Sequence, residues 1–226
     1  MAFDRYVIVV AGGAGLRMGR ETPKQFLPLF GKPILMHTLL QFYHCDPEFK
    51  IILVLPDAQR PEWKRLCRAH SFSVPHQVVL GGAERFHSVK EGLTLVPENA
   101  LVAVHDGVRP FVRHEVILRA FEEAEKHGGA IPVLPLAESI RKMDGEESTA
   151  LSRSEYRTVQ TPQVFKSSEL NKAYLQDFQP GFTDDASVYE SAGYSIRLVE
   201  GNAENIKITT PTDLAIAEVL HQLLHP

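Results

Sequence analysis

The strongest constraint on the fold is an alternation of short apolar runs with longer amphipathic segments. The apolar runs are nearly unbroken, as expected of strands buried on both faces of a parallel sheet, and they cover residues 6–11, 51–55, 77–80, 101–105 and 129–134. Segments with helical periodicity lie between them, at residues 33–44, 58–70, 84–95 and 113–127. This repetition predicts right-handed strand–helix–strand units and therefore an α/β fold with an open, doubly wound, mostly parallel sheet. A chain of 226 residues suits one such unit, and we expect a single domain over residues 1–226.

The alternation stops after Pro135. Residues 138–157 contain few apolar side chains, and the Asp144-Gly145 pair near their middle is a strong signal for a hairpin turn. A polar two-stranded hairpin without a core is unstable by itself. The segment at about 136–158 is therefore either a loose loop or a protruding β-hairpin arm that another subunit completes.

Beyond the hairpin the alternating pattern resumes. We expect further strands within residues 156–165, 195–201 and 205–210, helices near 167–178 and 184–193, and a last helix from Pro211. Proline suits the first turn of a helix, where its missing N–H has no intrahelical partner to lose. In this last helix, Ile216, Val219, Leu220 and Leu223 form the expected apolar stripe.

Composition narrows the classes of partner and compartment. The formal net charge of −4 gives no sign of a nucleic-acid-binding or membrane-binding surface. Cys45 and Cys67 lack any metal-binding or redox spacing, so we expect free thiols in a reducing compartment rather than a disulfide. The apolar run near the N-terminus is too short for a membrane span or a signal peptide and is expected to be a first strand. These features predict a cytoplasmic protein.

A glycine-rich segment follows the first predicted strand. Gly12, Gly13 and Gly15 lie within four residues and are followed by the cations Arg17 and Lys24. The segment lacks the third small residue of the dinucleotide-binding fingerprint, and the chain has no Walker sequence. Glycines let backbone amides approach phosphate oxygens, and two cations suit the charge of a nucleoside triphosphate. The alternative is a tight turn with two solvated charges.

Six separated motifs together resemble one enzyme family. They are AGGAGLRMG…PKQF from residue 11, GGAERFHSV (81–89), VHDGVRPF (104–111), TPQVF (161–165), TDDAS (183–187) and EGNAENIKIT (200–209). In this order they resemble the 2-C-methyl-D-erythritol 4-phosphate cytidylyltransferase family. The resemblance implies a Rossmann-like nucleotidyltransferase fold that transfers CMP from CTP to methylerythritol phosphate and releases pyrophosphate, in the non-mevalonate route to isoprenoid precursors.

The resemblance also assigns roles to individual residues. It implies catalytic roles for Arg17, Lys24, Arg153 and Lys207. It implies nucleotide binding by Ala11, Gly12, Gly13, Ala14, Gly15, Gly81, Gly82 and Ser88, and substrate binding by Asp106, Arg109, Ser139 and Thr183. Asp106 follows an apolar strand, where α/β sheets place ligands, and is expected to support Mg²⁺ bound to the CTP phosphates. The alternative is that Asp106 only caps the turn before Gly107.

In the resembled family the hairpin arm reaches into a neighbouring subunit's site. Arg153 and Ser139 lie on the predicted arm, so the resemblance implies a homodimer in which they complete the partner's site. Three positions depart from the family pattern: Gly12 replaces a frequent Ala, Ala83 a frequent Asp and Ser139 a frequent Thr. The change at residue 83 puts nucleotide affinity in question if the side chain there contacts the base.

The implied chemistry requires no general base. A phosphate monoester is ionised near neutral pH, so catalysis consists of bringing two anions together and stabilising charge at the α-phosphate. We therefore interpret His105 as structural, and expect Thr183 both to cap a helix and to bind substrate. Ribitol-5-phosphate cytidylyltransferase is the nearest alternative, and a catalytically silent nucleotide-binding regulator is an alternative of another class. Sugar-1-phosphate nucleotidyltransferases are disfavoured because they usually carry a longer insert between the Arg and the Pro-Lys pair.

Overall fold

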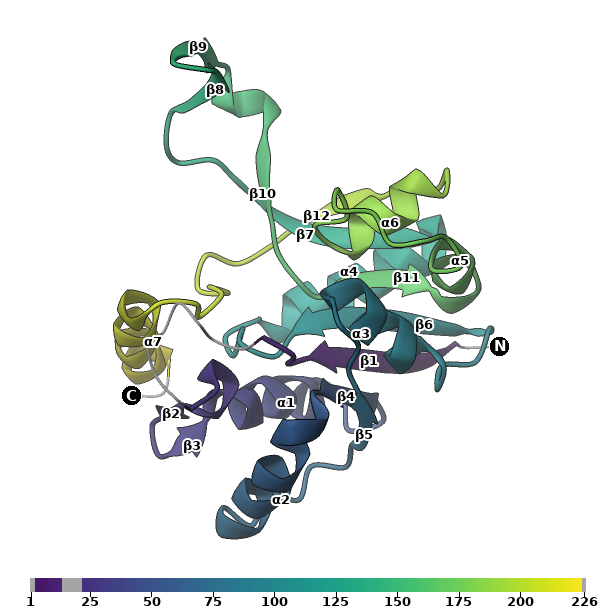
Figure 1. The fold of residues 1–226 in the computed structure, drawn as a ribbon, viewed down its shortest axis with the longest axis vertical. Coiled ribbons are helices and arrows are strands. Elements are labelled where there is room, and N and C mark those ends of the chain that lie inside the picture. Colours follow the sequence, from purple (N-terminus) through teal and green to yellow (C-terminus); the bar gives the residue numbers. More distant parts are fainter. Residues whose placement is uncertain (1–2, 14–21, 225–226) are drawn as a thin grey trace.

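The computed structural model describes residues 3–13 and 22–224 and contains a central mixed sheet flanked by helices (Figure 1). The sheet consists of β1 (Asp4–Val10), β4 (Lys50–Leu55), β5 (Gln77–Leu80), β6 (Ala100–Asp106), β7 (Gly129–Pro135), β10 (Arg157–Val159), β11 (Gln163–Lys166) and β12 (Arg197–Glu200). Its order is β10-β7-β11-β6-β1-β4-β5, and β12 also pairs with β7. β1 runs parallel to β4 and β6, β4 to β5, and β12 to β7, whereas β11 and β10 are antiparallel to their neighbours. The predicted mostly parallel, doubly wound sheet is confirmed.

Helices cover both faces of this sheet because its central strands are apolar on both sides. Val7 and Val9 of β1 pack with α1 (Ile34–Cys45), α2 (Arg60–Ala69) and α4 (His114–His127). Ile8, which points to the opposite face, packs with α3 (Arg85–Leu93), α5 (Ser167–Ala173) and α6 (Asp185–Ser191). All seven residues of β6 are buried, which explains why the sequence shows unbroken apolar runs there rather than an alternating pattern.

A third, smaller cluster joins the C-terminal helix α7 (Pro211–Leu224) to the short hairpin of β2 (Pro28–Leu29) and β3 (Lys32–Pro33). The expected strand at 205–210 is wrong: Ile208 is buried in this cluster, and its N–H donates to the Val108 carbonyl instead of joining the sheet. The expected apolar stripe of α7 is also largely wrong. Leu214 and Ala217 face the cluster, whereas Ile216, Val219 and Leu223 are exposed.

The predicted hairpin arm forms a separate two-stranded sheet of β8 (Ile140–Asp144) and β9 (Glu147–Leu151). Figure 1 shows it projecting well away from the central sheet. Asp144 pairs with Glu147, so the two turn residues are Gly145-Glu146, one position later than the Asp-Gly signal placed them. Gly145 occupies the first turn position, where its φ of 59° is a conformation that glycine adopts without steric cost.

Within the described ranges, no helix has the length and apolar content of a membrane span. Cys45 and Cys67 are free, half-buried thiols, in agreement with the prediction. Burial raises the pKa of both thiols to about 11.

Candidate active site

A pocket of about 290 Å³ opens where β1 and β6 end side by side. The parallel register places Val10 opposite Asp106, so the glycine segment after β1 and the turn after β6 leave the same edge of the sheet. The pocket is lined by several predicted site residues: Ala11, Gly12, Gly13, Lys24, Gly82, Ser88, Asp106 and Lys207. Gly81 lies beside it, with its N–H donating to the Leu55 carbonyl. Ala14, Gly15 and Arg17 lie outside the described residues.

Two glycines of this pocket lie close to neighbouring side chains, and Gly82 leaves no room for a Cβ atom. A Cβ atom on Gly82 would lie 2.3 Å from the Cβ of His87, and the Gly82 N–H donates to the Ser88 hydroxyl at 3.2 Å. A Cβ atom on Gly13 would lie 3.3 Å from Lys24 Cε, tighter than ordinary van der Waals contact. Gly13 and Gly82 are both exposed and line the pocket, so a ligand there can meet their backbone without an intervening side chain.

Gln25 anchors the start of the glycine segment and was not singled out from the sequence. It is 1 % exposed, and its side-chain amide donates to the Ala11 carbonyl at 2.8 Å. It lies in the short 3₁₀ turn η2 (Lys24–Phe26), directly after Lys24. Gln25 thus connects the turn that carries Lys24 to the glycine segment.

Asp106 lies at the centre of a cluster of three cations. Its Oδ2 accepts a hydrogen bond from Arg109 Nε at 3.0 Å and lies 3.1 Å from Lys207 Nζ. Its Oδ1 faces Arg85 Nε at 3.8 Å. Burial alone would raise the pKa of Asp106, but Arg85, Lys207 and Arg109 together hold it well below its usual range. Asp106 is therefore ionised at any physiological pH.

His105 is fixed as a neutral imidazole beneath this cluster. Its Nε2 lies 3.1 Å from the Arg109 carbonyl, which can only accept, so Nε2 carries the proton. Its Nδ1 accepts from the Thr161 hydroxyl at 3.0 Å, while the Asp106 N–H donates to the same hydroxyl oxygen at 3.1 Å. Burial lowers the pKa of His105 to about 4. This geometry agrees with the structural interpretation of His105.

A second pocket, of about 270 Å³, lies on the other side of Asp106. It is lined by Arg85, Asp106, Arg109, Val159, Gln160, Thr161, Gln163, Thr183, Asp184 and Lys207. Arg85, Asp106 and Lys207 line both pockets. The structure thus brings together Asp106, Arg109, Thr183 and Lys207 from three distant parts of the sequence.

Arg85, whose side chain is 28% exposed, forms an ion pair with the buried Asp185 that sequence reasoning missed. Two guanidinium nitrogens donate to the two Asp185 oxygens at 2.9 and 2.6 Å, and the Asp185 side chain is fully buried. Burial opposes the charge of Arg85, yet Asp185 and Asp106 raise its pKa above the usual range. Both residues lie inside quoted motifs, but an arginine and an acid at two helix starts give no sign that they contact each other.

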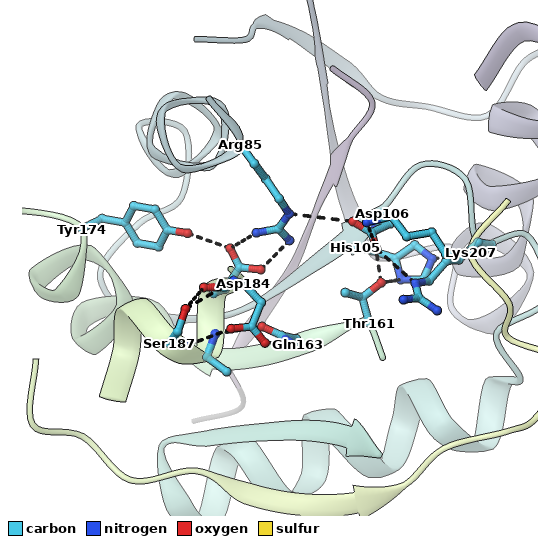
Figure 2. A network of polar contacts seen from close by, with 12 residues as sticks. Arg85, His105, Asp106, Thr161, Gln163, Tyr174, Asp184, Ser187 and Lys207 are labelled. Atoms are coloured by element: carbon cyan, nitrogen blue, oxygen red, sulfur yellow. Dashed lines mark hydrogen bonds and ion pairs between the residues drawn. The ribbon is translucent and has the colours of Figure 1, made fainter. Parts of the chain in front are cut away.

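The first turn of α6 is capped by Asp184 rather than by Thr183, so the capping role expected for Thr183 is wrong. Asp184 accepts from the Ser187 N–H at 2.9 Å, and the Ser187 hydroxyl completes a capping box. Gln163 joins this turn to β11, because its amide donates to Asp184 Oδ2 and its carbonyl oxygen accepts from the Ala186 N–H (Figure 2). Thr183, directly before the cap, is thereby left facing the second pocket.

Ser139 and Arg153 lie on the arm and line neither pocket. Arg153 is in a short 3₁₀ turn of the arm, and its guanidinium donates to the Ala137 carbonyl. Both side chains are exposed. The structure does not bring these two predicted site residues to the other site residues of their own chain.

Asp106 is also the predicted metal ligand. Within residues 3–13 and 22–224, no cluster of three or more His, Cys, Asp or Glu side chains is arranged to hold a metal ion. Mg²⁺ commonly uses one or two carboxylates and takes its other ligands from substrate phosphates and water. The donor set therefore fits an ion that enters with a nucleotide and meets Asp106, rather than one held by the protein alone.

Comparisons with known proteins cover nearly the whole chain. Residues 6–222 match the sequence profile of the 2-C-methyl-D-erythritol 4-phosphate cytidylyltransferase family. A protein of that name from Bacteroides thetaiotaomicron is 58% identical over 214 residues, covering 95% of this chain and 98% of its own. The crystal structure of 2-C-methyl-D-erythritol 4-phosphate cytidylyltransferase from Thermus thermophilus superposes with a TM-score of 0.76 at 31% identity, covering 95% of this chain and 98% of the other. 4-Diphosphocytidyl-2C-methyl-D-erythritol synthase from Anaerococcus prevotii gives 0.83 at 26% identity, covering 97% and 96%.

Proposed function

The chain belongs to the 2-C-methyl-D-erythritol 4-phosphate cytidylyltransferase family, and we propose that its two adjoining pockets bring CTP and a polyol phosphate together. The enzyme transfers CMP from CTP to 2-C-methyl-D-erythritol 4-phosphate, giving 4-diphosphocytidyl-2-C-methyl-D-erythritol and pyrophosphate for isoprenoid precursor synthesis. One observation carries the site assignment: two pockets meet at Arg85, Asp106 and Lys207, as a transfer between two bound substrates requires.

We assign CTP to the pocket beside the glycine segment. Supporting this, Gly13 and Gly82 expose backbone that a base or a phosphate can approach closely, and Lys24 lines the same space. Ala83 and Gly12 also line this pocket, so two of the three positions that depart from the family pattern lie within reach of a bound nucleotide. The second pocket, with Arg109, Thr183 and Lys207, suits a short polyol carrying one phosphate.

The transfer is a displacement at phosphorus. A phosphate oxygen of methylerythritol phosphate attacks the α-phosphorus of CTP, and a new P–O bond forms. The bond from the α-phosphorus to the oxygen that bridges to the β-phosphate breaks, and its electron pair leaves with pyrophosphate. Since the attacking oxygen is already ionised, the protein needs no base; it supplies positioning and charge stabilisation.

Different cations stabilise the triphosphate and the acceptor phosphate. Lys24 and Arg17 stabilise the charge that develops on the triphosphate, and Lys207 with Arg109 holds the acceptor phosphate close to it. Lys207 is well placed for this role because its side chain is 41% exposed while its ammonium is held 3.1 Å from Asp106. Preorganised cations of this kind lower the barrier without reorganising during the reaction.

Mg²⁺ is the proposed cofactor, held by Asp106 together with the CTP phosphates. When bound, it neutralises phosphate charge and orients the triphosphate. Arg109 and Lys207 keep the Asp106 carboxylate ionised and in place for this purpose.

We further propose a homodimer in which each arm completes the partner's site with Arg153 and Ser139. The exposure of both residues and their separation from the pockets of their own chain support this arrangement. The other partners are the two small substrates, without nucleic acid or membrane. We place the reaction in the cytoplasm, because both substrates carry several charges that a bilayer does not readily pass.

Pyrophosphate release from CTP tests the function. It is measured with methylerythritol 4-phosphate and, in parallel, with ribitol 5-phosphate, each with and without Mg²⁺. We expect release with methylerythritol 4-phosphate and Mg²⁺ and far less with ribitol 5-phosphate. A preference for ribitol 5-phosphate would reassign the acceptor, and no release with either would support a silent nucleotide-binding protein.

A further inference from the structure

Arg85 occupies the boundary between the two pockets without belonging to any assigned catalytic group. It is the first residue of α3 and lines both pockets. Figure 2 shows its side chain between Asp106 on one side and the carboxylate bound by Tyr174 on the other. Its Nε faces Asp106 Oδ1 at 3.8 Å, and its two terminal nitrogens bind Asp185.

Asp185 and Tyr174 fix the position of the Arg85 side chain. Asp185 accepts both guanidinium hydrogen bonds and a third from the Tyr174 hydroxyl at 2.6 Å. Asp185 and Tyr174 are 0% and 2% exposed, so neither can move without breaking core contacts. A planar guanidinium held at two points by a buried carboxylate has one orientation, and that orientation directs Nε toward Asp106.

The same ion pair connects the two substrate pockets mechanically. Arg85 begins α3, whose preceding loop carries Gly82 and whose first turn carries Ser88. Asp185 begins α6, directly after Thr183 and Asp184 of the second pocket. The Arg85–Asp185 pair therefore joins the backbone that surrounds the nucleotide pocket to the turn that lines the acceptor pocket.

Asp106 needs a cation on each oxygen if it is to stay between two anionic ligands. Arg109 and Lys207 both bind Oδ2, and Arg85 faces Oδ1. If Arg85 were displaced, the Asp106 carboxylate would be held through Oδ2 alone and could turn about that oxygen. Such a turn would shift the Lys207 ammonium, which Oδ2 contacts at 3.1 Å, relative to the acceptor phosphate.

We propose that Arg85 is a positioning residue of the transfer reaction. The Asp185–Tyr174 clamp fixes its guanidinium, which in turn holds Asp106 and sets the spacing of the nucleotide and acceptor pockets. This inference rests on the proposed function. It assigns Arg85 an effect on turnover that exceeds its effect on CTP binding, since Lys24 and the glycine segment after β1 are positioned by Gln25 and not by Arg85.

Arg85→Lys is the test variant, because the lysine keeps the charge but cannot bind Asp185 at two points and face Asp106 as well. With CTP, methylerythritol 4-phosphate and Mg²⁺, we expect kcat to fall by about 10²-fold, the loss typical of small misplacements, while KM for CTP changes by less than about threefold. Tyr189→Phe is the matched control: it removes a buried hydroxyl bound to Glu169 in the same helical layer, away from Arg85.

The control separates positioning from general loss of stability. Tyr189→Phe is expected to lower Tm while keeping kcat within about twofold. The proposal is overturned if Arg85→Lys keeps its kcat, or if both variants lose kcat in proportion to their loss of Tm. If Arg85→Lys does not fold, Asp185→Asn is tested instead. A folded Asp185→Asn enzyme with unchanged kcat overturns the proposal. A tenfold or greater loss of kcat, about 1.4 kcal/mol of barrier, supports it. Absence of pyrophosphate release by the unaltered protein would instead refute the proposed function.

Discussion

The cluster around Asp106 and the hairpin arm are both polar, but they are built in opposite ways. In the cluster, polar partners come from distant parts of the chain: Arg85 and Asp185 are 100 residues apart, and the Asp106 amide and Thr161 are 55 apart. In the arm the partners are local, with Arg141 and Ser148 only 7 residues apart and Arg153 and Ala137 only 16. Asp106, Thr161 and Asp185 of the cluster are buried, whereas the arm strands are largely exposed on both faces.

This difference indicates what each region can do alone. The cluster has its cations and carboxylates already paired and aimed at two pockets, so one chain can build that half of the site. The arm has a defined local shape and few partners for its outward side chains, as expected of a segment completed by another molecule. Substitutions in each region can test whether the two regions divide the site in this way.

The largest effect is expected from Lys207→Ala. The substitution removes the cation assigned to the acceptor phosphate, and kcat/KM should fall by about 10² to 10³-fold, as when other preorganised charge-stabilising groups are lost. Stability should change by less than about 1 kcal/mol, because the pair with Asp106 is partly solvated and Asp106 keeps Arg109. Pyrophosphate release and thermal unfolding measure the two quantities.

Lys126→Ala is the matched control for that change. Lys126 is an exposed cation of α4 that pairs with the Glu123 carboxylate at 2.9 Å, and it lines neither pocket. Its removal should leave kcat/KM within about twofold. A loss of less than fivefold for Lys207→Ala, or equal losses for the two lysines, would show that the Asp106 cluster is not the catalytic half of the site.

A mixing experiment gives the next largest effect. If each arm serves the partner's site, a heterodimer of one Arg153→Ala chain and one Lys207→Ala chain has one site with both lesions and one with neither. Equal mixing of two nearly inactive variants, with subunit exchange, should then restore about a quarter of wild-type activity. Mixtures as inactive as their parents would place Arg153 in the site of its own chain and remove the contrast between the regions.

The sequence correctly predicted the elements whose burial matches their local pattern of apolar and polar residues. Strands such as β6 are buried on both faces and therefore leave unbroken apolar runs. The Asp-Gly signal located the turn of the arm to within one residue. The strand expected at 205–210 failed because Ile206 and Ile208 alternate as in a strand but pack against the α7 cluster. Periodicity reports which side chains are apolar, and it does not report which surface they meet.

For the site, the motifs located Asp106, Arg109 and Lys207 but not the Arg85–Asp185 ion pair beside them. Arg85 and Asp185 each begin a helix, where a charged residue is usually solvated, and only the folded chain brings them to 2.6 Å. Gln25 is a similar case: nothing in its neighbourhood indicates that its amide binds the Ala11 carbonyl. Contacts across long sequence separations depend on the tertiary packing, which one sequence does not specify locally.

The smallest effect comes from adding one methyl group in each region. On Gly107, in the turn after Asp106, a Cβ atom would lie 2.9 Å from Ala11 Cβ and 3.0 Å from Leu35 Cδ1, so Gly107→Ala should cost about 1 to 3 kcal/mol by overpacking. On Gly145, at the tip of the arm, nothing lies within 4 Å and only the φ of 59° opposes a side chain, so Gly145→Ala should cost about 1 kcal/mol or slightly more, confined to the hairpin. The Tm of thermal unfolding should therefore fall for Gly107→Ala and stay nearly unchanged for Gly145→Ala. Gly107→Ala should also raise the KM for CTP, because Ala11 borders the nucleotide pocket. If Gly145→Ala shifted global unfolding as much as Gly107→Ala, the arm would be coupled to the core of its own chain, and its proposed dependence on a partner would lose its structural basis.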